Sequence, residues 1–248
     1  MFVATKGIKL QNEQTVKKSL NIVFIGDSIT EGDGAAAPPV YAADFLRQQS
    51  QVGHLNFSNQ GRSGFTTVNF LPSGGQTFNE VEHAADSLQQ LHKSVLVFSI
   101  MLGTNDSAMD GPLGSPVATA DYRKNMMTII DRLLKDYPGS KFFLHRPLWY
   151  SPNTYNRSRY LADGLQRLQS YFPQIDTIIT AYRYSHPNQV FAGDTTAFEF
   201  FRKNYSTYLK PEQGQQGTFY LHPDKAGAKV LAKFWSAAIS RRLDTFQN

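Results

Sequence analysis

Short apolar runs alternate along this chain with longer segments whose apolar residues recur at helical spacing. The runs predict buried strands at 20–25, 55–58, 95–102, 141–144 and 176–181. The longer segments predict helices at 39–49, 79–91, 121–136, 156–171 and 223–243. The run 95–102 is nearly all apolar, which is typical of a parallel strand covered on both faces. The alternation predicts an α/β fold with a mainly parallel sheet and helices on both faces.

The chain is predicted to form a single domain, residues 1–248. Its length of 248 residues fits one α/β domain, and neither an internal repeat nor a linker divides it. Residues 1–19 are predicted to be an N-terminal extension, which lacks the apolar core of a signal peptide. The segment 182–217 is predicted to be a long irregular insertion with a short helix near 195–203. Long segments of this kind often form lids or binding loops.

The composition excludes several classes of protein. Hydrophobic residues make up 41% and charged residues 18%, which excludes a disordered chain. No apolar stretch approaches the roughly 20 residues that span a bilayer, so a transmembrane helix is not expected. The absence of cysteine excludes disulfides and thiolate chemistry. The net charge of +5 is scattered, so nucleic acid is not an expected partner. The compartment stays open between the cytoplasm and, after removal of a signal peptide, the periplasm or exterior; the oligomeric state is not indicated.

Four polar loops carry residues that suit acyl transfer. Ser28 follows the first strand in GDSIT, Gly61 lies in NQGRSG, Asn105 lies in GTND, and His222 opens LHPDKAG. A serine hydroxyl can act as nucleophile beside an imidazole base, and the N–H groups of Ser28, Gly61 and Asn105 can hold an oxyanion. Each residue also has an ordinary explanation as a helix cap, a turn residue or a surface side chain. The occurrence of all four residues at the ends of neighbouring elements is what favours a catalytic site.

These blocks, in this order between Asn21 and Trp235, resemble the SGNH, or GDSL-type, hydrolases. The runs IVFIGDSITEG and IMLGTNDS are similar to carbohydrate and sialate O-acetylesterases of that family. The resemblance implies a flavodoxin-like three-layer α/β/α sandwich with neither a metal nor an organic cofactor. It also implies that Ser28 is the nucleophile, that His222 is the base, and that Ser28, Gly61 and Asn105 are the oxyanion donors.

The sequence departs from the family at one catalytic position. Family members usually carry an aspartate three residues before the histidine, and Phe219 stands there in this chain. Three interpretations follow: a backbone carbonyl orients His222 in a Ser–His dyad, a carboxylate from the long segment replaces the aspartate, or the protein is a weak or inactive relative. The carboxylates in question are Asp194, Glu199 and Glu212. Asp224 is a weaker candidate, because a place in the first turn of a helix already explains it.

We therefore expect a serine esterase that removes a short acyl group, acetyl foremost, from a small-molecule or glycan ester. The alternatives are a lipase, lysophospholipase or thioesterase of the same family, and a catalytically impaired carbohydrate-binding relative. Aromatic residues that could line a sugar or acyl site are Trp149, Tyr150, Tyr182, Tyr184, Phe198 and Phe201.

Overall fold

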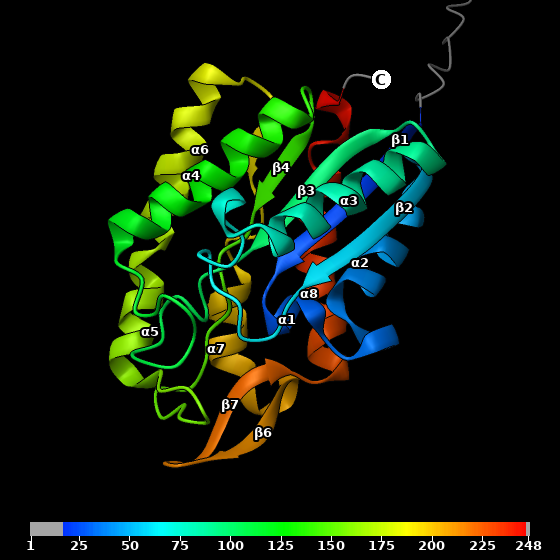
Figure 1. Cartoon of the computed structure of the whole chain (residues 1–248). Coiled ribbons are helices and arrows are strands. Elements are labelled where there is room, and N and C mark those ends of the chain that lie inside the picture. Colours follow the sequence, from blue (N-terminus) through cyan, green and yellow to red (C-terminus); the bar gives the residue numbers. More distant parts are fainter. Residues whose placement is uncertain (1–16, 247–248) are drawn as a thin grey trace, which may run out of the picture.

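A five-stranded parallel sheet forms the centre of the protein, for which a computed structural model describes residues 17–246 (Figure 1). Its strands are β1 (Lys18–Gly26), β2 (Val52–Gly61), β3 (Val95–Met101), β4 (Lys141–Leu144) and β5 (Val190–Ala192). They lie in the order β2-β1-β3-β4-β5, and every pairing is parallel. This is the flavodoxin-like order, so the predicted fold class is confirmed.

Helices cover both faces of this sheet. They are α1 (Ser28–Glu31), α2 (Pro38–Arg47), α3 (Gln76–Leu91), α4 (Thr119–Asp136), α5 (Leu161–Ser170), α6 (Phe172–Ser185), α7 (Ala197–Tyr208) and α8 (Lys225–Ser240), with short 3₁₀ turns at Gly34–Ala36, Pro72–Gly74 and Leu243–Thr245. Figure 1 shows α3 and α4 on one face, with α6 beside α4, and α2 and α8 on the other. None of these helices is long and apolar enough to cross a membrane.

β1 is an interior strand of the sheet, between β2 and β3. Its residues from Leu20 onward are fully buried, because strands flank it on both sides and helices cover both faces. The ring of Trp235 from α8 stacks on Phe24 with 5.9 Å between ring centroids. The buried side chain of Asn21 donates to the carbonyls of Leu88 and His92, so it ties the end of α3 to the strand.

The order of the strands reverses between β1 and β3. Such a reversal opens a crevice beyond the carboxyl ends of the strands, where ligands of open α/β sheets bind. Ser28 opens the short helix α1 just after β1, and the loop that follows β3 contains Asn105. The topology therefore brings two of the predicted site residues to one edge of the sheet.

A second, antiparallel sheet lies at this same end of the molecule. It is the hairpin of β6 (Leu209–Gly214) and β7 (Gly217–Pro223), and it joins α7 to α8 (Figure 1). The segment 182–217 is therefore not irregular as predicted, because it contains the end of α6, β5, α7 and β6. Of the predicted N-terminal extension, residues 1–16 lie outside the described residues, and Lys18 and Ser19 already belong to β1.

Two predicted elements differ in the structure. The strand predicted at 176–181 is wrong, because these residues lie within α6, where Ile175, Ile178, Ile179 and Tyr182 are buried at helical spacing. A short apolar run cannot by itself distinguish a strand from a buried helix. The helix predicted at 156–171 begins only at Leu161, so residues 145–160 form a long connection after β4.

Candidate active site

Ser28 is the first residue of α1 and lies two residues beyond the end of β1. The side chain of Asp27 caps this short helix, because its Oδ1 accepts a hydrogen bond from the Ile29 N–H at 2.9 Å. The capping role that the sequence also offered for Ser28 thus belongs to its neighbour. Gly26 allows the tight turn, since a Cβ there would lie 2.0 Å from Thr30 Oγ1. The Ser28 hydroxyl is left to face the end of the sheet.

His222 contacts Ser28 across a separation of 194 residues. Its Nε2 lies 2.9 Å from Ser28 Oγ, which is within reach for proton transfer. The sequence placed His222 on a loop, but the residue belongs to β7. Pairing with β6 therefore holds the imidazole, and the hairpin and α1 lie together at one end of the molecule (Figure 1).

The carboxylate of Glu212 holds the other side of the His222 ring. Nδ1 of His222 lies 3.0 Å from Oε1 and 2.9 Å from Oε2 of Glu212, and the His222 backbone N–H donates to Oε2 at 3.3 Å. A carboxylate on Nδ1 fixes the tautomer in which Nε2 accepts a proton. Ser28, His222 and Glu212 thus form one continuous hydrogen-bonded chain.

The other two candidate carboxylates lie elsewhere. Asp194 caps the start of α7, where it accepts from the N–H groups of Thr196 and Ala197. Glu199 forms an exposed salt bridge with Arg202. Asp224, which was a weaker candidate, is the N-cap of α8 and accepts from the Gly227 N–H at 2.7 Å. Of these residues, only Glu212 touches His222.

The register of the hairpin explains why Phe219 does not leave His222 without an acid. Phe219 on β7 pairs directly with Glu212 on β6. The phenyl ring is buried, with 1% of its surface exposed, so it packs into the core. The carboxylate therefore comes from the neighbouring strand instead of from the strand that carries the histidine.

The structure does not support Gly61 as an oxyanion donor. Its N–H already donates to Oδ1 of Asn59 at 2.9 Å. Gly61 is required for a different reason, since a Cβ there would lie 2.1 Å from the backbone nitrogen of Glu31. Gly64, three residues further along the same loop, is exposed with φ of 76°, and its N–H has no hydrogen-bond partner among residues 17–246. The N–H of Ser28 is likewise unpaired within the described part of the chain.

The side chain of Asn105 is almost completely buried and held at both ends. Its Nδ2 donates to the carbonyl of Phe65 at 2.9 Å, and its Oδ1 accepts from the hydroxyl of Tyr160 at 2.6 Å. An amide nitrogen carries two hydrogens, so one N–H of Asn105 is still available. Tyr160 is a contact that the sequence analysis missed, since a lone tyrosine before a helix carries no signal.

Two buried carboxylates, Asp27 and Asp106, directly adjoin Ser28 and Asn105 in the chain. Burial raises the pKa of Asp27 to about 6, against the opposing effect of its bond to the Ile29 N–H. Burial also raises the pKa of Asp106 to about 7, although Asp106 accepts from the N–H and the hydroxyl of Thr67. Asp106 follows Asn105 directly, so its bond to Thr67 anchors the loop that carries Gly64 against the loop that carries Asn105.

A second serine–histidine contact shows why distance alone does not define a site. Ser99 Oγ lies 2.9 Å from Nε2 of His145, but both residues are buried in the core. Nδ1 of His145 accepts from the Asp194 N–H at 2.8 Å, so Nε2 carries the proton and donates to Ser99. Burial also lowers the pKa of His145 to about 3. This histidine cannot take a proton from its serine.

A small cavity of about 190 Å³ lies beside Ser28 and His222. The residues around it include Ile29, Ala36 and Pro38, together with Lys210 from β6. Pockets that hold drug-sized ligands have volumes of roughly 300–1,000 Å³, so this cavity fits only a small group.

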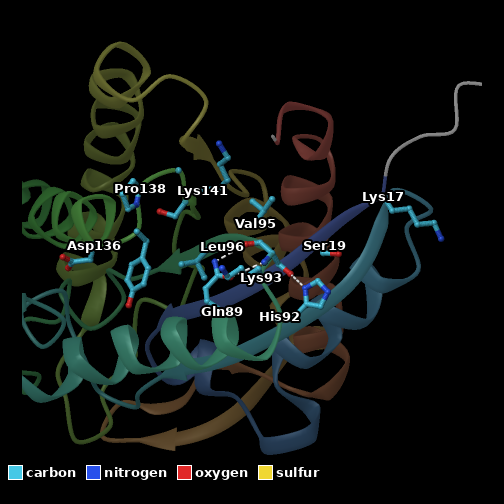
Figure 2. A pocket seen from close by; sticks show the side chains of 14 residues that line it. Lys17, Ser19, Gln89, His92, Lys93, Val95, Leu96, Asp136, Pro138 and Lys141 are labelled. Atoms are coloured by element: carbon cyan, nitrogen blue, oxygen red, sulfur yellow. Dashed lines mark hydrogen bonds between the residues drawn. The ribbon is translucent and has the colours of Figure 1, made fainter. Parts of the chain in front are cut away.

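A larger groove of about 1180 Å³ lies at the opposite end of the sheet (Figure 2). It runs along the amino ends of β3 and β4, beside Val95 and Lys141, and none of the predicted site residues lines it. Its size alone does not make it the active site, because Ser28 and His222 lie at the other end of the sheet.

The aromatic candidates do not gather at Ser28. Tyr150 is buried against Ser107, and the hydroxyl of Tyr182 contacts Asp131. Tyr184 is 82% exposed, while the remaining three, Trp149, Phe198 and Phe201, are buried. None of them lines the small cavity.

Solved structures with the same fold include several esterases. An acetylxylan esterase from Geobacillus stearothermophilus has 18% identity and a TM-score of 0.60, with 92% of this chain and 96% of that chain covered. A carbohydrate acetylesterase from Sinorhizobium meliloti has 14% identity and a TM-score of 0.56, covering 91% and 99%. A lipase/acylhydrolase from Enterococcus faecalis has 16% identity and a TM-score of 0.55, covering 90% and 96%. Likeness at these identities shows a common fold. No curated protein sequence matches the chain.

The class that this fold and family define is that of the serine ester hydrolases. The chain belongs to the GDSL-like lipase/acylhydrolase family, whose sequence model matches residues 24–230. The family predicted from the four sequence blocks is thereby confirmed.

Proposed function

We propose that this protein hydrolyses short acyl esters, with acetyl esters of carbohydrates as the foremost substrates, through an acyl-enzyme on Ser28. The observation that carries the proposal is the hydrogen-bonded chain from Ser28 through His222 to Glu212. It supplies a nucleophile, a base and an acid that orients the base. The family membership supports an acylhydrolase. What we propose in addition is the identity of the acyl group and of the alcohol in the ester.

The reaction proceeds in two halves. Ser28 Oγ attacks the ester carbonyl while its proton passes to Nε2 of His222, and the imidazolium then protonates the departing alcohol. Water attacks the acyl-enzyme in the second half and gives a proton to the same nitrogen. The tetrahedral intermediate then breaks down to the carboxylic acid, while the imidazolium returns the proton to Ser28 Oγ. Glu212 stabilises the imidazolium in both halves without becoming protonated itself.

Hydrogen-bond donors must stabilise the negative charge on the oxygen of the tetrahedral intermediate. We assign this role to the free N–H of Asn105 and to the N–H of Ser28. We leave Gly61 out of this assignment, because its N–H donates to Oδ1 of Asn59.

The short acyl group is supported by the size of the cavity beside Ser28. About 190 Å³ accommodates an acetyl or slightly longer group, whereas a long fatty acyl chain would extend beyond it. The carbohydrate part is supported by the acetylxylan esterase and the carbohydrate acetylesterase that share the fold.

Replacement of the nucleophile tests the proposal. S28A is expected to abolish hydrolysis of p-nitrophenyl acetate while the circular dichroism spectrum stays that of the wild type. S99A is the matched control, because Ser99 also lies 2.9 Å from a histidine nitrogen but is buried; its turnover should persist. Unchanged turnover in S28A would end the proposal.

Two further measurements separate the alternatives. Covalent labelling of Ser28 by a fluorophosphonate supports an enzyme, whereas absence of labelling together with glycan binding supports a carbohydrate-binding relative. A series of p-nitrophenyl esters from acetate to palmitate should show kcat/KM falling beyond about four carbons. A maximum at long chains would instead indicate a lipase.

A further inference from the structure

The hydroxyl of Tyr160 makes a short hydrogen bond inside the proposed oxyanion site. It donates to Oδ1 of Asn105 at 2.6 Å, and only 4% of Tyr160 and 3% of Asn105 are exposed. The nitrogen of the same amide donates to the Phe65 carbonyl. Since the oxygen and one N–H are both engaged, the amide plane has one orientation and one N–H left to donate.

We propose that Tyr160 is a positioning residue for ester hydrolysis, which holds the Asn105 amide so that its free N–H faces the oxyanion. This inference rests on the proposed function and adds a residue to its machinery. Tyr160 does not touch the reacting atoms. It acts through Asn105, whose carbonyl oxygen would otherwise be buried without a partner.

Hydrogen bonds hold the backbone just before Tyr160 against the loop after β3. The Met109 N–H donates to the carbonyl of Arg159 at 2.6 Å, and the Arg159 N–H donates to the carbonyl of Asp110 at 3.0 Å. Leu161, the next residue, has φ of 57°, a left-handed conformation that is costly for a branched side chain. Strain of this kind persists where the surrounding structure imposes it, and it is concentrated at functional sites.

The connection that carries Tyr160 also holds the strand of the base. The Ser151 N–H donates to the carbonyl of Tyr220 at 2.9 Å, and the Tyr220 N–H donates to Ser151 Oγ at 2.8 Å. Asn153 adds a bond to the carbonyl of Thr218 at 2.8 Å. Residues 145–160 therefore join β7, which presents His222, to Asn105. They set the distance between the base and the oxyanion donor.

The Tyr160 hydroxyl keeps its proton and can therefore always donate a hydrogen bond. Burial raises the pKa of Tyr160 far above neutrality, so the group stays protonated wherever the enzyme works. Donation to the oxygen of an amide draws electrons from its nitrogen and strengthens the N–H as a donor. The Tyr160 hydroxyl thus orients the amide and polarises it in the direction that the oxyanion requires.

Tyr160→Phe is the direct test, and Tyr150→Phe is its matched control. Both tyrosines are buried, and their rings lie 5.4 Å apart. The hydroxyl of Tyr150 contacts Ser107 instead of Asn105. Y160F is expected to lower kcat for p-nitrophenyl acetate about tenfold with KM nearly unchanged, whereas Y150F should stay within about twofold of the wild type.

The double variant separates positioning from simple loss of stability. N105A alone should lower kcat by about 10²–10³, as loss of one oxyanion donor does. Adding Y160F to N105A should then change kcat by less than twofold, because the amide that Tyr160 positions is gone. A full tenfold loss in the N105A background, or equal losses in Y160F and Y150F, would overturn the inference. Neither result would affect the S28A test, so the two proposals can fail separately.

Discussion

At the scale of single residues, the acid that faces His222 is a glutamate on the adjacent strand. A glutamate side chain is one methylene longer than aspartate, which helps it to cross from β6 to the ring on β7. Both of its oxygens lie within 3.0 Å of Nδ1, and one of them also accepts the His222 backbone N–H. The contact therefore fixes the ring as well as its tautomer.

Glu212→Gln is expected to reduce kcat by about 10²–10⁴. The amide nitrogen of glutamine can donate to Nδ1 and favour the wrong tautomer, as loss of the negative carboxylate does in other serine hydrolases. The initial rate of p-nitrophenyl acetate hydrolysis measures the effect. E199Q, which changes the exposed partner of Arg202, should keep the wild-type rate. Equal rates for E212Q and the wild type would leave a Ser–His dyad as the better interpretation.

At the scale of secondary-structure elements, the end of β2 packs against α1 with no room for a side chain. The nearest atoms to a Cβ at Gly61 are all backbone atoms of Thr30 and Glu31, at 2.1 to 2.7 Å. Backbone cannot move aside as a flexible side chain can. The glycine in NQGRSG therefore sets how closely β2 approaches the helix that begins with Ser28.

Gly61→Ala is expected to lower the free energy of unfolding by about 1–3 kcal/mol, the usual cost of overpacking. It should also lower activity, because α1 and Ser28 must shift, although the N–H of residue 61 is retained. Urea denaturation and the esterase assay measure the two effects. Gly74→Ala is the control, since its Cβ would make only an ordinary contact of 3.7 Å with the Asn69 carbonyl. A stable and fully active G61A would refute this account of the packing.

At the scale of the whole molecule, two buried carboxylates with raised pKa values make stability depend on pH. The folded protein keeps a proton on Asp106 up to about pH 7, whereas the unfolded chain loses it near pH 4. The folded state thus binds more protons between these values. The contribution of Asp106 to stability therefore falls as pH rises through this window and is constant above it.

Asp106→Asn should remove this contribution. Its Oδ1 can still accept from the N–H and hydroxyl of Thr67, so the fold is retained. The free energy of unfolding of the wild type minus that of D106N should decrease from pH 4 to pH 7, as measured by urea denaturation. The free energy of unfolding of D121N, a variant at an exposed position of α4, should show the same pH dependence as that of the wild type. A difference that rises with pH would show that Asp106 is stabilised as the anion.

Much of the central sheet and its helices was predictable, because the patterns that indicate them involve residues close together in the sequence. The strands at 95–102 and 141–144 are apolar runs, and the helix at 121–136 shows a complete helical period, so residue type and spacing suffice. The strand predicted at 176–181 failed where a short apolar run fits either structure. The three acid candidates were equivalent in sequence, and only the pairing of β6 with β7 distinguishes Glu212 from the others.

The sequence by itself determined four of the five strands of the central sheet, the four loops that carry polar residues, and the family. Burial patterns and glycine-rich turns depend on residues that are close together in the sequence, so they can be predicted without coordinates. Only the tertiary structure showed that Glu212 contacts His222, that the N–H of Gly61 donates to Asn59, and that Tyr160 donates to Asn105. These are contacts between segments distant along the chain, and their geometry arises only when the whole sheet and its hairpin assemble.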